Sequence, residues 1–269
     1  SLDLFTSHEQ QYGGITFNIV PAFSGDIDVL EAFAETSIPI TSQLQTDLSI
    51  RVADYSPEGI DTVLSYSAGL IWEPVEGYRF RGNYARAQRA PTITELMSPP
   101  RGDYDTYSDI CDGVTATSTE PGHDNCRLEP TIAAVIATEG VFEDENSGYG
   151  PNAGNLALAE ETADTYTIGF SINPGFLPNF YLAVDYYDIS IEDVIQAYEN
   201  SVIINQCYNS SLAWGPDNLF CNDITRDSDG NIIEIMNKLY NQAELNTSGY
   251  DLALDWMFEL GRGGDLTFD

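Results

Sequence analysis

The chain has 269 residues and a formal net charge of -33, because 43 acidic residues stand against only 10 Lys and Arg. Nucleic-acid binding depends on clusters of basic side chains, so this balance argues strongly against a nucleic-acid partner. Disordered tails are often this acidic, but 42% hydrophobic and 12% aromatic residues are too many for a chain that does not fold.

No stretch of the sequence approaches the roughly 20 consecutive apolar residues that a membrane-spanning helix requires. The first residues, Ser1 to Leu4, lack the basic start and the apolar core of a signal peptide. These features exclude a helical membrane protein. They do not exclude a membrane β-barrel, because the lipid-facing residues of a barrel strand recur only at every second position.

The N-terminal part of the chain gives a weak pattern followed by a clear one. Residues 1–27 show no sustained period, so we expect the tail of a loop, with at most a weak strand at residues 15–20. Residues 28–40 look extended. Apolar and polar residues then alternate from Leu48 to Val52, which is the period of a strand with one apolar and one polar face.

The clearest hairpin pairs residues 64–72 with residues 78–84. Its first segment alternates apolar residues with Ser and Gly, and its second alternates aromatic residues with Arg and Asn. The connection at residues 73–77 contains Pro and Gly, which favour a tight turn.

A long irregular segment follows at residues 91–162 and is rich in Gly, Pro, Asp and Ser. Only residues 131–138 suggest a short helix or a buried run. A connection of this length is uncommon in compact domains, so we expect it to be functional or mobile.

Strands return in the second half of the chain. Residues 165–172 alternate cleanly, and residues 180–186 continue the pattern until the apolar parity slips by one at Tyr186 and Tyr187. A β-bulge or the exit of the strand from lipid would explain the slip. A second long loop is expected at residues 196–230, a strand at residues 250–258, and a turn at residues 261–264.

Short and long connections therefore alternate along the chain, as they do in outer-membrane barrels. The strands carry one aromatic-rich apolar face and one polar face, and Trp72, Tyr78 and Trp256 lie at strand ends where interfacial aromatic residues are expected. The alternative is a soluble β-sandwich or an extracellular β-helix. Strands in such folds are usually shorter, about five or six residues, so the barrel is favoured.

The four cysteines form two local pairs, Cys111 with Cys126 and Cys207 with Cys221. Among the three possible pairings, these two local disulfides are favoured, and they imply an oxidising compartment. Neither pair has the spacing or the neighbouring histidines of a zinc site.

Five segments of the sequence carry recognisable motifs. Residues 86–96 read Arg-Ala-Gln-Arg-Ala-Pro-Thr-Ile-Thr-Glu-Leu, which resembles the S-R-A-x-R-A-P-x-x-x-E-L segment of TonB-dependent outer-membrane receptors. Residues 31–40 resemble its E-A-F-A-E-x-x-I-P-L strand, and residues 154–170 resemble its G-N-P-x-L-x-P-E-x-A-x-x-Y-x-x-G strand start. Residues 184–189 and 245–252 are similar to two further strands. The segments depart from the family at Ala159, where many relatives have Lys or Pro, and at Met97, which replaces the usual Phe.

The resemblance implies an all-β fold, an antiparallel transmembrane β-barrel of 22 strands in the bacterial outer membrane. About eight strands would lie in this chain, and the N-terminal plug domain of the family would lie outside it. Residues 28–269 would then form part of the barrel, with long extracellular loops at residues 91–162 and 196–230. Eight strands with two unpaired edges would leave backbone groups unsatisfied in lipid, so we expect a fragment of a longer protein.

The resemblance also implies the import of a scarce nutrient with energy from the inner membrane. The expected partners are the TonB complex, through an N-terminal region that is missing here, together with outer-membrane lipid and lipopolysaccharide. The ligand would be a small molecule such as an iron-siderophore chelate, cobalamin or an oligosaccharide. The alternative is a non-transport barrel or β-rich module for surface adhesion or scaffolding.

Arg79, Arg81 and Arg89 are the candidate lumen-facing residues. Arg79 and Arg81 share one side of a strand with Asn83, and Arg89 joins them if the parity holds, whereas Arg86 faces the other way. They would form an electropositive strip for an anionic ligand or for plug carboxylates, or they would simply pair with acidic residues. Pairing is favoured, because ten basic residues among 43 acidic ones rarely lack a partner.

The remaining chemistry-bearing residues do not predict an enzyme, a cofactor or a metal site. Residues 223–231 resemble part of a Ca²⁺ loop, but Lys238 stands where an EF-hand needs Glu, so a hairpin turn is favoured. The acidic residues at 139 and 143–145 would bind divalent cations or remain a solvated loop, which is the default. Only His8 and His123 are present, and neither lies near a plausible nucleophile.

Overall fold

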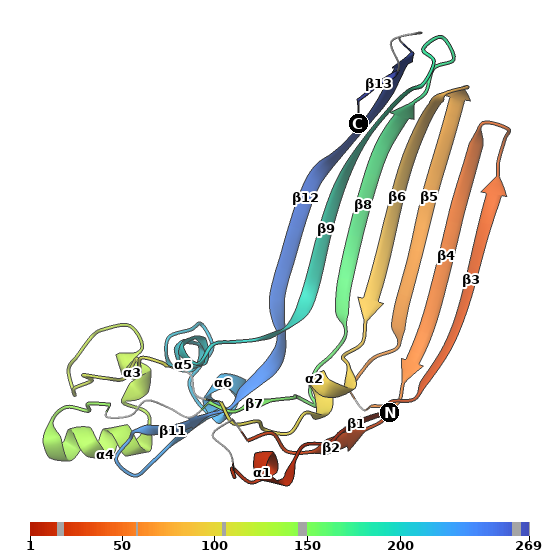
Figure 1. Ribbon diagram of the computed structural model, residues 1–269. Helices are drawn as coiled ribbons and strands as arrows, with labels where there is room; N and C mark the ends of the chain where they lie inside the picture. Colours follow the sequence, from red (N-terminus) through yellow and green to blue (C-terminus); the bar gives the residue numbers. More distant parts are fainter. Residues whose placement is uncertain (15–18, 58, 104–105, 145–149, 260–264, 269) are drawn as a thin grey trace. The chain divides into compact units, whose positions relative to one another are not determined.

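The computed structural model describes residues 1–269 except 15–18, 58, 104–105, 145–149, 260–264 and 269. Eight strands lie side by side in one antiparallel sheet, in the spatial order β13-β12-β9-β8-β6-β5-β4-β3 (Figure 1). They are β3 (Val29–Pro39), β4 (Leu44–Tyr55), β5 (Val63–Val75), β6 (Tyr78–Arg89), β8 (Glu161–Ile172), β9 (Phe180–Ala197), β12 (Asn237–Glu259) and β13 (Asp265–Phe268). The mainly antiparallel, β-rich architecture is the one that the alternating pattern predicts.

The predicted hairpin is confirmed. β5 pairs with β6 in antiparallel register, with Trp72 opposite Phe80 and Ala68 opposite Tyr84. Short turns join β3 to β4, β5 to β6 and β8 to β9 at one end of the sheet, and the longer connections leave from the other end (Figure 1). The turn expected at residues 261–264 lies outside the described residues.

The two faces of the sheet differ sharply in chemistry. The apolar face carries large side chains that remain exposed in this chain: Leu48, Ile50, Leu70, Trp72, Phe80, Ile168, Phe170, Leu252 and Leu254. The polar face carries small and polar residues in the intervening positions: Asp47, Ser49, Ser67, Gly69, Asn83, Thr165, Thr167, Gly169 and Asp185. An exposed apolar surface of this extent marks contact with a lipid or protein partner.

Tyrosines mark the level at which the apolar face becomes polar. The rings of Tyr66 and Tyr84 lie 6.0 Å apart, and the rings of Tyr84 and Tyr166 lie 4.8 Å apart. Beyond them, toward the long connections, the same face carries Arg86 and Asp164. Aromatic residues between an apolar band and a charged zone are typical of a membrane interface.

The parity slip at Tyr186 and Tyr187 is not a bulge against β8. The register runs without a shift from Thr162 opposite Glu192 to Ile172 opposite Leu182. The apolar face of β9 instead changes character beyond Tyr186, where Asp188, Ser190 and Glu192 follow. The bulge prediction is therefore wrong for this pairing, and the slip reflects a strand that continues past its apolar band.

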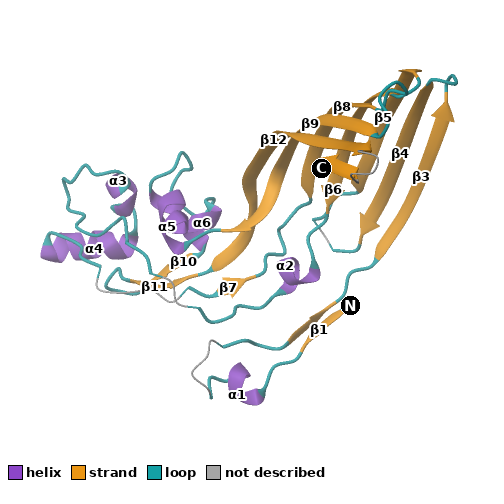
Figure 2. Cartoon of the chain, turned by 45° about the horizontal axis from the view of Figure 1, so that its top comes forward, coloured by secondary structure: helices purple, strands orange, loops and turns teal. Residues whose placement is uncertain are grey.

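The remaining residues form a second compact unit, here called the loop unit, which comprises residues 1–26, 92–157 and 196–240; the other residues form the sheet unit. All helices in the described part of the chain belong to the loop unit (Figure 2). They are α1 (His8–Gln11), α2 (Ile93–Met97), α3 (His123–Cys126), α4 (Pro130–Glu139), α5 (Asn200–Tyr208) and α6 (Leu219–Asn222). None of the described helices is long and apolar enough to cross a membrane.

Short strands complete the loop unit. β1 (Leu2–Leu4) pairs with β2 (Phe23–Gly25), and β10 (Ile224–Arg226) pairs with β11 (Ile232–Ile235). β7 (Asn152–Ala153) runs parallel to the first residues of β12. Most of the weak strand expected at residues 15–20 lies outside the described residues, and Ile19 and Val20 are not in a strand.

The helix suggested at residues 131–138 is present as α4. It begins with Pro130 at its first turn and ends at Gly140, whose φ of 87° provides a left-handed C-cap. Ile132 is fully buried and joins α4 to the core of the loop unit.

Candidate functional site

The three candidate arginines Arg79, Arg81 and Arg89 lie on the polar face of β6. The register places them opposite Ser171, Gly169 and Glu161, whereas Arg86 lies on the other face, opposite Asp164. This is the alternation that the sequence suggests. It brings the three residues to one face. Arg79 and Arg81 are neighbours on that face, and Arg89 lies eight positions further along the strand.

Each of these arginines has an acidic partner. The guanidinium of Arg79 donates to Glu73 over 3.1 Å, and Arg89 donates to Glu161 over 2.5 Å. Arg81 donates through Nε to Asp185 over 2.6 Å and through Nη2 to the same carboxylate. These three arginines are therefore neutralised by ion pairs and do not form an electropositive strip.

The pair between Arg81 and Asp185 joins two strands that are not neighbours. Arg81 is on β6 and Asp185 is on β9, and Gly169 of β8 lies between them in register with both. A Cβ atom at Gly169 would overlap the carboxylate of Asp185. Glycine at this position is what allows the ion pair to cross the intervening strand.

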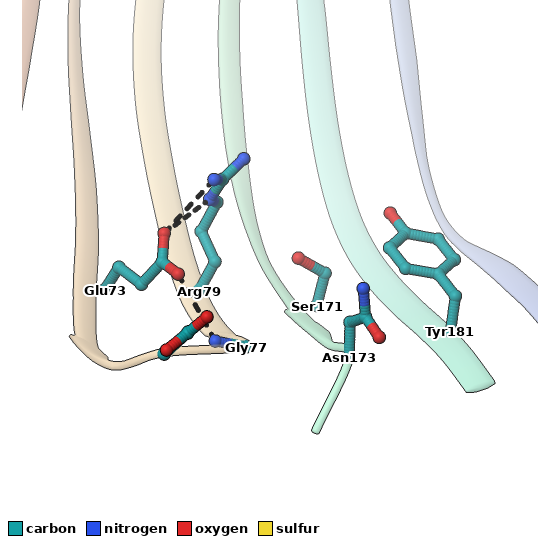
Figure 3. A pocket seen from close by; sticks show the side chains of 7 residues that line it. Glu73, Gly77, Arg79, Ser171, Asn173 and Tyr181 are labelled. Atoms are coloured by element: carbon teal, nitrogen blue, oxygen red, sulfur yellow. Dashed lines mark hydrogen bonds and ion pairs between the residues drawn. The ribbon is translucent and has the colours of Figure 1, made fainter. Parts of the chain in front are cut away.

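A small hollow lies on the polar face near the short turns (Figure 3). It has a volume of about 290 Å³ and is lined by Glu73, Glu76, Gly77, Arg79, Ser171, Asn173 and Tyr181. The carboxylate of Glu73 accepts from Arg79 and from the backbone N–H of Gly77, so that it holds both the strand and the turn. The lining suits water and polar groups, and it offers no nucleophile with a base beside it.

The loop unit has a hydrophobic core to which two long segments contribute. They are residues 92–157, here called the first connection, and residues 196–240, here called the second connection. The first connection supplies Cys111, Val114, Cys126, Ile132 and Phe142, and the second supplies Ile203, Ile204, Cys207, Tyr208, Phe220, Ile232, Ile235 and Tyr240. These side chains are at most 4% exposed. The two connections are therefore packed segments of one core.

A buried ion pair sits beside this core. Arg226 donates to both carboxylate oxygens of Asp109, over 2.6 Å and 3.0 Å, and their side chains are 3% and 0% exposed. Arg226 also donates to the hydroxyl of Tyr208 over 3.1 Å. Burial disfavours the charged guanidinium, but the bonds to Asp109 outweigh this effect and raise the pKa of Arg226. Sequence reasoning missed this pair, since nothing local links residues so far apart in the chain.

Both local disulfides are present in the structure. Cys111 is bonded to Cys126 and Cys207 to Cys221, with Cα atoms 5.6 Å and 4.8 Å apart. Each bridge lies within one long connection, and Cys111, Cys126 and Cys207 are buried in the core.

The other residues singled out in the sequence take structural roles. Residues 227–231 form the turn between β10 and β11, in which the carboxylate of Asp227 accepts from the N–H groups of Asp229 and Asn231. The side chain of His123 is buried against Ser118, with Nδ1 2.7 Å from its hydroxyl oxygen. Among the described residues, no group of acidic, His or Cys side chains is arranged to hold a metal ion. Glu145 of the acidic segment lies outside the described residues.

Comparison with known proteins decides the family. The model of the TonB-dependent receptor-like β-barrel matches residues 3–269. The chain belongs to the TonB-dependent receptor family. It is therefore an outer-membrane protein, from a family of receptors rather than enzymes. No curated protein matches this receptor chain.

Solved structures agree on the fold of this TonB-dependent receptor. The ferric enterobactin receptor of Pseudomonas aeruginosa, in complex with enterobactin, is 13% identical with a TM-score of 0.55, over 90% of this chain and 26% of that one. The siderophore receptor PirA of Acinetobacter baumannii is 13% identical with a TM-score of 0.52, over 87% of this chain and 27% of that one. The chain thus spans about a quarter of the length of these receptors, and identities this low show the fold alone.

Proposed function

We propose that this chain is part of a receptor that imports a scarce nutrient across the outer membrane, with energy delivered by the TonB complex of the inner membrane. The family match over residues 3–269 carries the proposal. The two-faced sheet supports it, because an exposed apolar face suits lipid while a polar face suits a water-filled lumen. In this orientation Arg79, Arg81 and Arg89 face the lumen.

The proposed ligand is a small molecule, and the candidates are an iron-siderophore chelate, cobalamin and an oligosaccharide. The two similar receptors named above are a ferric enterobactin receptor and a siderophore receptor, which makes an iron chelate the first to test. The proposed partners are the TonB complex, outer-membrane lipid and lipopolysaccharide. The TonB complex would bind through a plug or N-terminal region of the whole receptor.

Uptake by whole cells tests the proposal. Cells that express the full-length receptor are given radiolabelled ferric siderophores, cobalamin or oligosaccharides, and uptake is compared with that of cells lacking the receptor and of cells lacking TonB. We expect uptake of one ligand class to require both proteins. Membrane fractionation and heat-modifiable migration on a gel serve as controls for correct insertion. A correctly inserted receptor that supports no TonB-dependent uptake would favour the adhesion or scaffold alternative.

A further inference from the structure

The two long connections of the loop unit share one hydrophobic core. Phe142 of the first connection packs against the turn of the second at Gly230, which has a φ of 88° and leaves no room for a Cβ atom beside the Phe142 ring. A Cβ atom at Gly230 would also lie only 3.3 Å from the side chain of Ile132 in α4. The turn between β10 and β11 thus packs closely against the first connection.

Polar contacts join the same two segments at several other points. Asn125 donates to the carbonyl of Tyr208 over 2.9 Å, Tyr107 donates to the carbonyl of Ile232 over 3.3 Å, and Asn155 donates to the carbonyl of Leu239 over 2.9 Å. All three side chains belong to the first connection and all three carbonyls to the second. The contacts are spread over the full length of both segments.

Arg226 makes contacts with both connections at once. Its guanidinium binds Asp109 of the first connection and Tyr208 of the second, and it lies 5.8 Å from the Phe142 ring centroid and 5.2 Å from that of Tyr208. Separating the connections would leave the charges of Arg226 and Asp109 buried without partners or would open the core to water. Removing one partner of a buried ion pair is strongly destabilising for this reason.

We infer that the described residues of 92–157 and 196–240 open as one cooperative body, held together by Arg226 and Asp109, and not as two independent loops. The inference goes beyond import, and only its meaning for ligand entry rests on the proposed function. If the body gates ligand access, then both connections move together when the gate opens. Each disulfide fixes a single connection, so the cross-connection tie depends on the core and on this ion pair.

Hydrogen exchange on the full-length receptor in detergent tests the inference without any ligand. In the unsubstituted receptor, under conditions where exchange reports the opening rate, we expect the amides of α4 and α5 to exchange in the same opening event. Rates that differ by more than about tenfold between α4 and α5 would overturn the inference.

The variant Arg226→Met sharpens the test. It leaves Asp109 buried without its partner, and we expect exchange to accelerate by about a hundredfold in α4 and α5 alike. The control Arg101→Met removes an exposed arginine from the first connection and should change neither helix. Acceleration in α5 and the β10–β11 hairpin with α4 unchanged would show two independent loops. Should Arg226→Met fail to assemble, the comparison of α4 with α5 in the unsubstituted receptor still decides the question.

Discussion

At the scale of single residues, Gly169 decides whether Arg81 and Asp185 can form an ion pair across the strand that lies between them. We expect Gly169→Ala to displace Asp185 from Arg81 and to lower the free energy of unfolding by about 1–3 kcal/mol, because the added methyl group overlaps the carboxylate. Thermal unfolding of the full-length receptor in detergent measures this change. The matched control is Gly82→Ala, where a Cβ atom meets only the carbonyl oxygen of Thr167, at 3.9 Å. Equal effects at the two glycines would contradict the assignment.

The buried tyrosines of the loop unit give a pH prediction. Burial raises the pKa of Tyr107 and of Tyr208 above the ordinary value of 10.0, although Arg226 opposes the shift at Tyr208. The unfolded chain then loses these protons at a lower pH than the folded chain, so their contribution to stability is complete below pH 10 and falls as pH rises beyond it. Alkaline titration followed by tyrosinate absorbance should show late-titrating tyrosines, and Tyr107→Phe should remove part of the late phase. Titration of all tyrosines near pH 10 would contradict the prediction.

Sequence reasoning reached part of this residue-level picture. The parity of residues 79–89 places Arg79, Arg81 and Arg89 on one face, because strand alternation is a local property. It also favours acidic partners over an electropositive strip, from composition alone. It could not name the partners, since Asp185 and Glu161 are brought to β6 only by strand pairing. The glycine in a strand interior at position 169 was the one available signal for a close approach.

At the scale of elements, the two faces of β8 should respond differently to charge. We expect Ile168→Arg, on the apolar face and 64% exposed in this chain, to cost about 2–4 kcal/mol in a bilayer. The neighbouring Thr167→Arg, on the polar face, should cost much less, because in the proposed orientation this face meets water. Folding of the receptor into vesicles of defined lipid, monitored by heat-modifiable migration, measures both. Comparable losses for the two variants would argue against lipid contact at Ile168.

The two disulfides should act on the elements that they enclose. Non-reducing peptide mapping is expected to link Cys111 to Cys126 and Cys207 to Cys221. Replacing both Cys207 and Cys221 by Ala should lower the stability of the loop unit by about 2–4 kcal/mol, since the bridge closes a loop between residues that are 14 positions apart. Hydrogen exchange in α5 reports the loss. A crosslink that joins Cys111 or Cys126 to Cys207 or Cys221 would contradict this pairing.

Most strands were predictable because their residues alternate strictly, as from Leu64 to Trp72. Of the two explanations for the parity slip at Tyr186, a bulge or exit from lipid, the bulge does not hold for the pairing with β8. A change of apolar parity looks the same in a sequence whether the backbone inserts a residue or the surroundings change from lipid to water. Only the unbroken register with β8 separates the two explanations.

At the scale of the whole molecule, the loop unit is the part that sequence reasoning could not assemble. Residues 91–162 and 196–230 were predicted as two long loops, because each segment taken alone shows no sustained hydrophobic period. Their joint core depends on contacts such as Arg226 with Asp109, which lie 117 residues apart in the chain. The five family segments, in contrast, were sufficient to identify the family, which the model matching residues 3–269 confirms.

The length of β9 and β12 sets the distance between the lipid and the ends of these strands. The rings of Tyr186 and Tyr250 lie 5.1 Å apart and mark one level on the two strands. From there β9 continues to Ala197 and β12 extends back to Asn237, which at about 3.3 Å per residue is roughly 36 Å of β9 and about 43 Å of β12 past the tyrosines. If the apolar face on the other side of the tyrosines meets lipid, as proposed, this span of strand lies outside the acyl chains and is surrounded by water and polar groups.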